Sequence, residues 1–288
     1  MATSPGALLV ADSFRVRVNL RTGGAEVRGL SLHVERFRRS AIEALLGEPP
    51  APDPRPALRA PDSRESAAHA AVDAFLAEAL PRIAAYGEGF PRLELRGAAD
   101  RAPEFGLSLR PLPELRTAIE LRTAPPLPLE HPERKGPNLD RLTAVNRRLG
   151  AEALLVDWRG RAVEGATTSL LWWPRAGDDR EPRGAVSASS RRVRSVTERL
   201  LVEAGGRRLL GETPRRGRVG RPQPRSATVA ELARHEVWAV NALHGIRLVA
   251  AIDGVPQAPP EERRLRWFRE ALDRCWQPLA QGGEFTTA

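Results

Sequence analysis

Lysine occurs once in this sequence of 288 residues, at Lys135, although the chain carries 45 lysine and arginine residues in total. Almost every positively charged side chain is therefore an arginine. A guanidinium stays protonated and is a poor nucleophile, whereas a desolvated lysine amine can lose its proton and condense with a carbonyl. A lysine kept among so many arginines indicates amine chemistry at this position, with a leftover surface lysine as the alternative.

The composition narrows the class of protein. A hydrophobic share of 41% over this length is enough to bury a core. The single Cys275 excludes an intrachain disulfide, and no Cys or His spacing is typical of a zinc site, so we expect no metal. No stretch approaches the roughly 20 apolar residues of a membrane span, and residues 1–10 lack the pattern of a signal peptide. We expect a cytoplasmic protein that does not associate with membranes.

Hydrophobic periodicity predicts alternating helices and strands, hence an α/β (α+β) fold. Prolines 111 and 113 cannot continue a central strand, so we expect a small α/β domain over residues 1–112 and a large domain over residues 113–288. Ser31 is the expected N-cap of the first helix. The elements expected in the small domain are strands 14–20 and 25–28, helices 31–45 and 66–86, and strands 92–96 and 105–110.

In the large domain, Asn138 is the expected cap of a short helix, and Gly205 with Gly206 should end a helix that starts at Ser195. Thr228 and Glu231 have the spacing of a capping box. A last helix after Pro260 should carry its apolar stripe as far as Leu279. The strands expected here are 117–122, 152–157, 161–164, 167–173, 236–241 and 245–252.

Several of these segments resemble the class IV aminotransferases, the fold-type IV pyridoxal phosphate enzymes that include branched-chain and D-amino-acid aminotransferases and aminodeoxychorismate lyase. The segment RKGPNLDRL, residues 134–142, resembles the family segment in which the Schiff-base lysine precedes a helix. The segment EALLVDWRGRAVEGATTSLLWW, residues 152–173, is similar to the family's hairpin signature. The resemblance covers most of the chain. It implies a two-domain fold of the D-amino-acid aminotransferase type, pyridoxal 5'-phosphate as cofactor, and a homodimer.

The resemblance also assigns roles to single residues. It implies that Lys135 forms an aldimine with the cofactor and that Glu164, in the hairpin signature, keeps the pyridine nitrogen protonated. Arg36, within the segment LSLHVERFRR, matches the arginine that binds the cofactor phosphate. The large domain is then the main cofactor-binding domain.

Two loops complete the implied phosphate site. Val196 and Thr197, which follow Ser195, are similar to the family's turn at a helix start, where backbone N–H groups bind the phosphate. Asn241 and Ala242, followed by leucine, are similar to the loop that closes this site. His244, next to that loop, could reach a substrate carboxylate, and a structural role is the alternative.

The sequence departs from the family pattern at the positions that determine substrate specificity in the family. The resemblance begins near DSFRVR, residues 12–17, so we expect most of the N-terminal strand pair and the usual Gly-Asp-Gly segment to be missing. Tyr86 is the only tyrosine, so the pocket tyrosines are absent, and Ser169 replaces the common asparagine of the signature strand. These changes do not affect the bond to the cofactor. They fall where the substrate is selected, so the sequence does not identify the substrate.

The motifs therefore favour a pyridoxal phosphate enzyme acting on a small-molecule amine. The Asn-Ala-Leu triplet at 241–243 is most similar to the lyase, which eliminates pyruvate and releases 4-aminobenzoate. An aminotransferase of the branched-chain or D-amino-acid type and a specialist of secondary metabolism are the alternatives. A nucleic-acid-binding protein is a more distant alternative, suggested by the net charge of +9 and the run PRRGRVGRPQPR at 214–225. A solvated loop explains that run equally simply, because no aromatic platform accompanies it.

Overall fold

The computed structural model describes residues 6–47, 63–98, 101–173, 184–210 and 221–279. Contacts divide the chain into two compact units. The first, which we call the small unit, comprises residues 1–113, 134–137 and 277–288, and the second, the large unit, comprises residues 114–133 and 138–276. No helix among the described residues is both long enough and apolar enough to cross a membrane.

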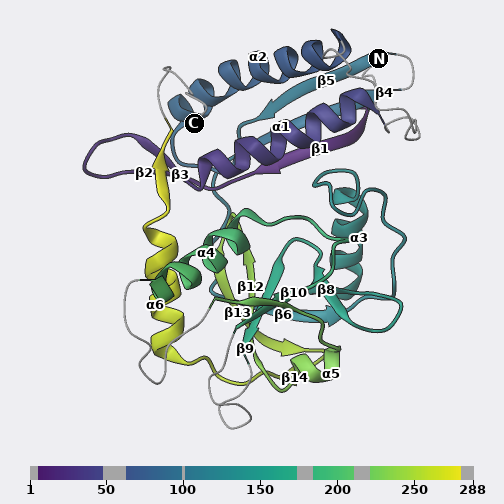
Figure 1. Ribbon diagram of the computed structural model, residues 1–288, viewed down its shortest axis with the longest axis vertical. Helices are drawn as coiled ribbons and strands as arrows, with labels where there is room; N and C mark the ends of the chain where they lie inside the picture. The colour runs from purple at the N-terminus through teal and green to yellow at the C-terminus, as the bar shows by residue number, and fades with distance from the viewer. Residues whose placement is uncertain (1–5, 48–62, 99–100, 174–183, 211–220, 280–288) are drawn as a thin grey trace. The chain divides into compact units, whose positions relative to one another are not determined.

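A three-stranded antiparallel sheet and two helices build most of the small unit (Figure 1). The sheet has the order β1-β4-β5, with β1 at Ala7–Ser13, β4 at Arg92–Ala98 and β5 at Arg101–Ser108. The helices are α1, Leu30–Leu46, and α2, Ser63–Tyr86. Their apolar faces meet the sheet in a cluster of three phenylalanine rings, in which Phe37 lies 5.8 Å from Phe75 and 6.4 Å from Phe105 between ring centroids.

Strand β1 is missing from the predicted elements. The strand obtains its hydrogen bonds from β4, with Val10 opposite Leu95 and Asp12 opposite Leu93. Its partner is distant in sequence, so local propensity gives little sign of it. The predicted strand 14–20 shortens to β2, Val16–Val18, which pairs with β3, Ala25–Arg28.

The start of α1 also differs from the prediction. The helix begins one residue before the expected N-cap Ser31, and Gly29 is the N-cap in a left-handed conformation with φ 64°. A glycine adopts this conformation at little cost, so no side-chain cap is needed. The peptide N–H of Ser31 instead donates to Oε1 of Gln277, at 3.4 Å.

A nine-stranded sheet, which curls on itself, forms the centre of the large unit (Figure 1). Its strands are ordered β11-β10-β9-β12-β13-β6-β7-β8, and β14 pairs with β13. Strand β13 runs parallel to β6, and β6 parallel to β7, whereas the hairpins β7-β8 and β12-β13 are antiparallel. The bounds are β6 Ala118–Thr123, β7 Glu152–Val156, β8 Ala162–Gly165, β9 Ser169–Trp173, β10 Ala185–Ser187, β11 Gln223–Arg225, β12 Glu236–Asn241, β13 Gly245–Ile252 and β14 Val255–Pro256.

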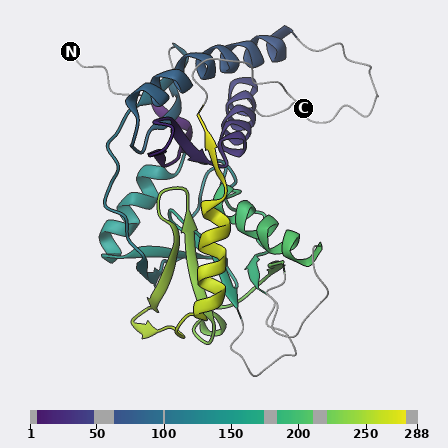
Figure 2. The same cartoon turned by 90° about the vertical axis from the view of Figure 1, so that its left-hand side faces the viewer.

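The helices of the large unit lie around this sheet (Figure 2). They are α3 Leu139–Leu149, α4 Val196–Leu210, α5 Val229–Leu232 and α6 Glu262–Asp273. The capping box predicted at Thr228 and Glu231 is confirmed in α5. Two predicted helix ends are wrong: α4 continues past Gly205 and Gly206, and α6 ends at Asp273, after which Trp276–Pro278 form strand β15.

Packing explains why α4 continues through two glycines. Ala204 and Gly205 are buried, and the side chain of Arg221 lies 3.4 Å from where a Cβ on Gly206 would be. α4 also packs against α6. Two glycines in a helix cost about 2 kcal/mol of propensity, and such tertiary contacts commonly outweigh this amount.

Three aromatic rings join α6 to the sheet. Trp173 of β9 and Trp238 of β12 lie 4.1 Å apart between centroids, and Phe268 of α6 lies 5.6 and 5.4 Å from them. All three side chains are fully buried. Beside them, Arg264 of α6 forms a buried ion pair with Glu236 of β12. These contacts fix the position of the last helix on the sheet.

We expect Phe268→Ala to lower the free energy of unfolding of the large unit by about 3–5 kcal/mol, because it leaves a cavity against two buried tryptophans. Arg266→Ala, an exposed change on the same helix, should change it by no more than about 0.5 kcal/mol. All six tryptophans lie between residues 158 and 276, inside the large unit, so tryptophan fluorescence during urea unfolding measures this unit. Equal midpoints for the two variants would contradict the packing described.

Candidate active site

A buried carboxylate organises one part of the small unit. Arg36 of α1 donates from Nε to Oδ2 of Asp12 at 2.8 Å and from Nη2 to Oδ1 at 2.7 Å. The Nδ1 atom of His33 lies 2.9 Å from the same Oδ1. The Asp12 and His33 side chains are each 1% exposed, and that of Arg36 is 11% exposed. The two-pronged contact fixes the plane of the guanidinium.

The charges of this cluster follow from its surroundings. Burial raises the pKa of the Asp12 carboxyl, but the positive charge of Arg36 and the hydrogen bond from His33 outweigh burial, and the pKa lies far below its ordinary value. Burial lowers the pKa of His33 below 6.5, and the positive charges of Arg36 and Lys135 also lower it. The negative charge and hydrogen bond of Asp12 raise this pKa, but they do not cancel the other effects. Asp12 is therefore ionised and His33 neutral, so Nδ1 of His33 carries the hydrogen that Asp12 accepts.

The loop that contains Lys135 runs directly against β1. The peptide N–H of Ala11 donates to the carbonyl oxygen of Lys135 at 2.7 Å. At the next position, Gly136 has a φ of +138°, and a Cβ there would lie 2.7–2.8 Å from backbone atoms of Val10 and Ala11. Only glycine fits such a close approach. Lys135 is half-buried and is held beside the strand that carries Asp12.

The base of this loop is closed by Asn138. Its Nδ2 donates to the carbonyl oxygen of Glu130 at 2.6 Å, and its Oδ1 accepts from the Glu130 N–H at 3.1 Å. Asn138 does occupy the N-cap position of α3, so the predicted position is confirmed. Its side chain makes no capping hydrogen bond, so the predicted capping interaction is wrong. The amide bridges the loop because it offers a donor and an acceptor to one residue.

In the large unit, Glu164 lies at the end of β8 and is 8% exposed. Its Oε1 accepts from the peptide N–H of Val193 at 3.4 Å. Val193 belongs to the segment that leads into α4, so the position of the carboxylate is tied to the start of that helix. Glu164 is thus a buried carboxylate on a rigid strand rather than a solvated one.

The first turn of α4 contains two of the predicted phosphate-binding residues. Val196 and Thr197 are 5% and 4% exposed. The first N–H groups of a helix have no partner within the helix. Ser195 accepts from the N–H of Glu198 through Oγ at 3.2 Å, which leaves the N–H groups of Val196 and Thr197 as donors at the helix start, where the helix dipole favours an anion.

Asn241 shapes the turn between β12 and β13. Its Oδ1 accepts from the N–H groups of Leu243 and His244 at 3.2 and 2.9 Å, and its Nδ2 donates to the carbonyl oxygen of Thr167 at 3.3 Å. Ala242 lies at the middle of this turn. The Nδ1 atom of His244 accepts from the N–H of Arg116 at 3.2 Å, which gives His244 a structural contact at the base of the turn.

The predicted site residues thus fall into two groups. Lys135 and Arg36 are together in the small unit; the large unit contains Glu164, Val196, Thr197, Asn241, Ala242 and His244. Sequence reasoning missed Asp12 and His33. The spacing of His33 and Arg36 places both on one face of α1, which was an available signal, whereas nothing local identified Asp12 as their partner.

No protein-family model matches this chain, and no curated protein matches it in sequence. Solved structures do. The branched-chain amino acid aminotransferase from T.th., solved with pyridoxamine 5'-phosphate, superposes with a TM-score of 0.66 at 18% identity, over 96% of this chain and 90% of that chain. A hypothetical aminotransferase from Mycobacterium tuberculosis in its PLP-bound form gives a TM-score of 0.62 at 19% identity, over 92% and 88%.

A candidate 4-amino-4-deoxychorismate lyase from Legionella pneumophila gives a TM-score of 0.60 at 14% identity, over 92% of this chain and 91% of that chain. At these identities, similarity shows the fold. The chain has the fold of the class IV aminotransferases, the fold-type IV architecture, and the predicted fold is confirmed.

We expect Asp12→Asn to destabilise the small unit by about 3–5 kcal/mol near neutral pH, because it leaves the largely buried Arg36 without its ionised partner. Asp73→Asn removes an exposed ion pair with Arg38 in the same unit and should cost less than about 1 kcal/mol. Circular dichroism during urea unfolding, fitted for two transitions, measures both effects.

The pH dependence has a defined sign. The pKa of Asp12 and that of His33 are both lowered in the folded chain, so the unfolded chain binds protons more readily and acid destabilises the fold. The contribution of Asp12 is complete above its ordinary pKa of 3.8 and declines below it. The stability gap between the wild type and Asp12→Asn should therefore narrow as the pH falls below this value. A gap that stays constant would contradict an ionised Asp12.

Proposed function

We propose that this chain is an enzyme that uses pyridoxal 5'-phosphate and that Lys135 binds the cofactor covalently. The observation that carries the proposal is the place of the only lysine of the chain: its backbone is hydrogen-bonded to β1, next to the cluster of Asp12, His33 and Arg36. The fold supports it, since the hypothetical aminotransferase from Mycobacterium tuberculosis has the same fold and was solved in a PLP-bound form.

The chemistry of the donor set fits this cofactor group by group. An aldehyde needs a primary amine, which Lys135 offers. A phosphate needs fixed cationic and N–H donors; Arg36 is a fixed cation, and the start of α4 offers N–H groups. A pyridine nitrogen needs a buried carboxylate, which Glu164 offers. In the turn after β12, Nδ2 of Asn241 already donates to the carbonyl oxygen of Thr167, so we assign the peptide N–H of Ala242, rather than the Asn241 side chain, as the donor to phosphate.

When bound, the cofactor supplies an electron sink that stabilises negative charge at the substrate carbon. The Nζ atom of Lys135 would take the proton from that carbon and return it at the later step. Glu164 would hold a proton on the ring nitrogen. Arg36, with the N–H groups of Val196 and Thr197, would hold the phosphate and so orient the ring without taking part in bond changes.

Asp12 and His33 act as positioning residues in this proposal. Asp12 fixes the guanidinium of Arg36 through two hydrogen bonds, and the neutral His33 donates to Oδ1 of Asp12, an oxygen that Arg36 also contacts.

Two reactions fit the same residues. We favour elimination of the aminodeoxychorismate lyase type, in which the substrate releases pyruvate and 4-aminobenzoate, because the Asn-Ala-Leu triplet at 241–243 is most similar to that enzyme. Transfer of the amino group to a keto acid is the second candidate. It is favoured by the similarity in fold to the two aminotransferases described above. A specialised amine of secondary metabolism remains within the same chemistry. We also propose a cytoplasmic homodimer, as the family resemblance implies.

Lys135→Arg should abolish covalent retention of pyridoxal phosphate and lower turnover by at least about 10²-fold, because the guanidinium cannot act as the nucleophile or the proton carrier. Borohydride reduction followed by peptide mass mapping locates the adduct. The mapping is simple because Lys135 is the only side-chain amine. An adduct elsewhere, or none in the wild type, would overturn the proposal.

A matched control moves the lysine without changing the composition. The double variant Lys135→Arg, Arg122→Lys has one lysine again, now on the exposed side of β6. It should fold like the wild type and form no stable adduct, because an exposed amine stays protonated and lacks the other cofactor contacts. Retention of cofactor by this variant would show that any lysine of the chain suffices.

Pyruvate release separates the two reactions. Wild-type protein loaded with pyridoxal phosphate and given 4-amino-4-deoxychorismate should produce pyruvate and 4-aminobenzoate without any keto acid, in equal amounts. Lys135→Arg is the negative control. Product that appears only when a keto acid is added, together with the corresponding amino acid, would refute elimination and establish amino transfer.

A further inference from the structure

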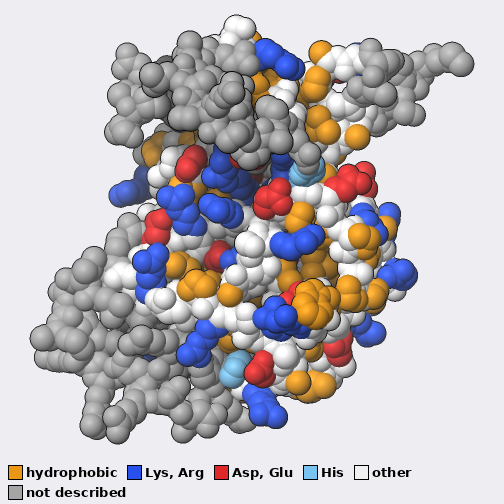
Figure 3. Space-filling model, turned by 45° about the vertical axis from the view of Figure 1, so that its right-hand side comes forward, with side chains coloured by type: hydrophobic (Ala, Val, Ile, Leu, Met, Phe, Trp, Pro, Cys, Tyr) orange, Lys and Arg blue, Asp and Glu red, His pale blue; other side chains and the backbone are white. Residues whose placement is uncertain are grey.

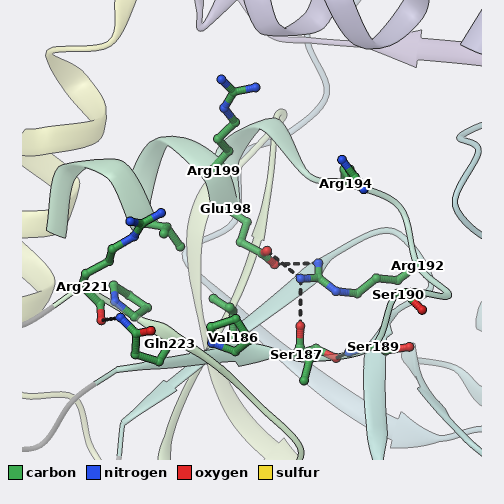
Figure 4. Close-up of a pocket in the computed structure, with 14 residues that line it drawn as sticks. Val186, Ser187, Ser189, Ser190, Arg192, Arg194, Glu198, Arg199, Arg221 and Gln223 are labelled. Atoms are coloured by element: carbon green, nitrogen blue, oxygen red, sulfur yellow. Dashed lines mark hydrogen bonds and ion pairs between the residues drawn. The ribbon is translucent and has the colours of Figure 1, made fainter. Parts of the chain in front are cut away.

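A second candidate binding site lies on the large unit, at a pocket of about 570 Å³. Strand β10, the segment after it, one face of α4 and the residues of β11 surround the pocket (Figure 4). Val186 and Ser187 of β10, and Pro222 and Pro224, are among the residues that line it. None of the residues to which the proposed function assigns a role lines it.

Arginine dominates the charged lining. Arg192, Arg194, Arg199 and Arg221 line the pocket together with a single acid, Glu198. Glu198 is already paired, since Arg192 donates to its two carboxylate oxygens at 2.8 and 2.7 Å and also to the carbonyl oxygen of Ser187 at 3.0 Å. Figure 4 shows these two side chains pointing toward each other. Among the described residues of the lining the arginines outnumber the acids by three, and Arg199 is itself paired with Glu203 outside the lining.

The paired residues form a rigid part of the wall. The side chains of Arg192 and Glu198 are each only 11% exposed. Burial raises the pKa of Glu198 against the effect of Arg192. Arg194, from the segment before α4, and Arg221, from the residues before β11, also line the pocket (Figure 4), and Ser189, Ser190 and Gln223 add hydroxyl and amide groups. Two further cations in the same lining suit a ligand with more than one negative charge.

The shape favours a small anion over a nucleic acid. None of the described residues that line the pocket is aromatic, whereas proteins that bind single strands usually stack bases on aromatic rings along a positive groove. On the face visible in Figure 3, Lys and Arg side chains are spread among acidic and apolar ones. The volume matches that of pockets for small molecules.

We propose that this pocket binds a small anion that carries two or more phosphate or carboxylate groups. Arg194 and Arg221 contribute the charges that hold the ligand, and the pair of Arg192 and Glu198 shapes the wall. The site is separate from the proposed cofactor site, so its ligand is an additional effector or substrate group rather than the cofactor phosphate.

The test is a calorimetric titration of the wild-type chain, saturated with pyridoxal phosphate, with pyrophosphate and, separately, with citrate at constant ionic strength. The double variant Arg194→Ala, Arg221→Ala should bind the preferred anion at least about tenfold more weakly, because two charge-assisted contacts are lost. Arg263→Ala, Arg266→Ala removes the same charge from exposed positions of α6 and should bind like the wild type.

Pyrophosphate binding with weak citrate binding identifies a phosphate ligand, the reverse identifies a polycarboxylate, and both support the pocket. No binding of either anion overturns the proposal, as does equal weakening in both double variants. Retention of a single-stranded oligonucleotide that pyrophosphate cannot displace also overturns it, in favour of nucleic-acid binding.

The outcome is independent of the proposed function. If the chain fails to retain pyridoxal phosphate, the same titration on the unloaded chain still measures the pocket, because only its dependence on Arg194 and Arg221 counts. If the chain retains the cofactor and no anion binds, the cofactor proposal stands and the pocket proposal fails.

Discussion

The buried carboxylate of Asp12 is the interaction on which the small unit's part of the site depends. An isolated ionised carboxylate inside a protein is strongly unfavourable, and Asp12 is tolerated because Arg36 and His33 satisfy it from α1. This requires β1 and α1 to keep their relative position. The N–H of Ala11 in β1 also donates to the carbonyl oxygen of Lys135. The same strand therefore fixes both the Arg36 side chain and the backbone at Lys135.

In the large unit, the position of Glu164 depends on the segment between β10 and α4. The N–H of Val193 donates to the Glu164 carboxylate, and its neighbours Arg192 and Arg194 line the arginine-rich pocket. Ser195, directly after them, accepts from the first turn of α4. One short segment therefore contacts the Glu164 carboxylate, leads into α4 and lines the pocket.

The sequence predicted the elements whose signals are local. The capping box of α5 needed only the spacing of Thr228 and Glu231. Strand β1 and the ends of α4 and α6 were missed because their reasons are tertiary: β1 depends on β4, and α4 continues through two glycines because it packs on neighbouring side chains. The same limit applies to the site, where the family segments pointed to Lys135 but Asp12 has no local signature.

Lys135 and Gly136 show two independent constraints on adjacent residues. The glycine is fixed by backbone geometry, because its φ of +138° and its approach to Val10 and Ala11 leave no room for a Cβ. The loop at the lysine is held through the carbonyl oxygen of Lys135, which every amino acid possesses, so this contact does not depend on the side chain. The other 44 lysine or arginine residues of the chain are all arginine. The proposal that Lys135 reacts through its amine draws on this contrast between a backbone contact that any residue can make and a side chain that occurs once.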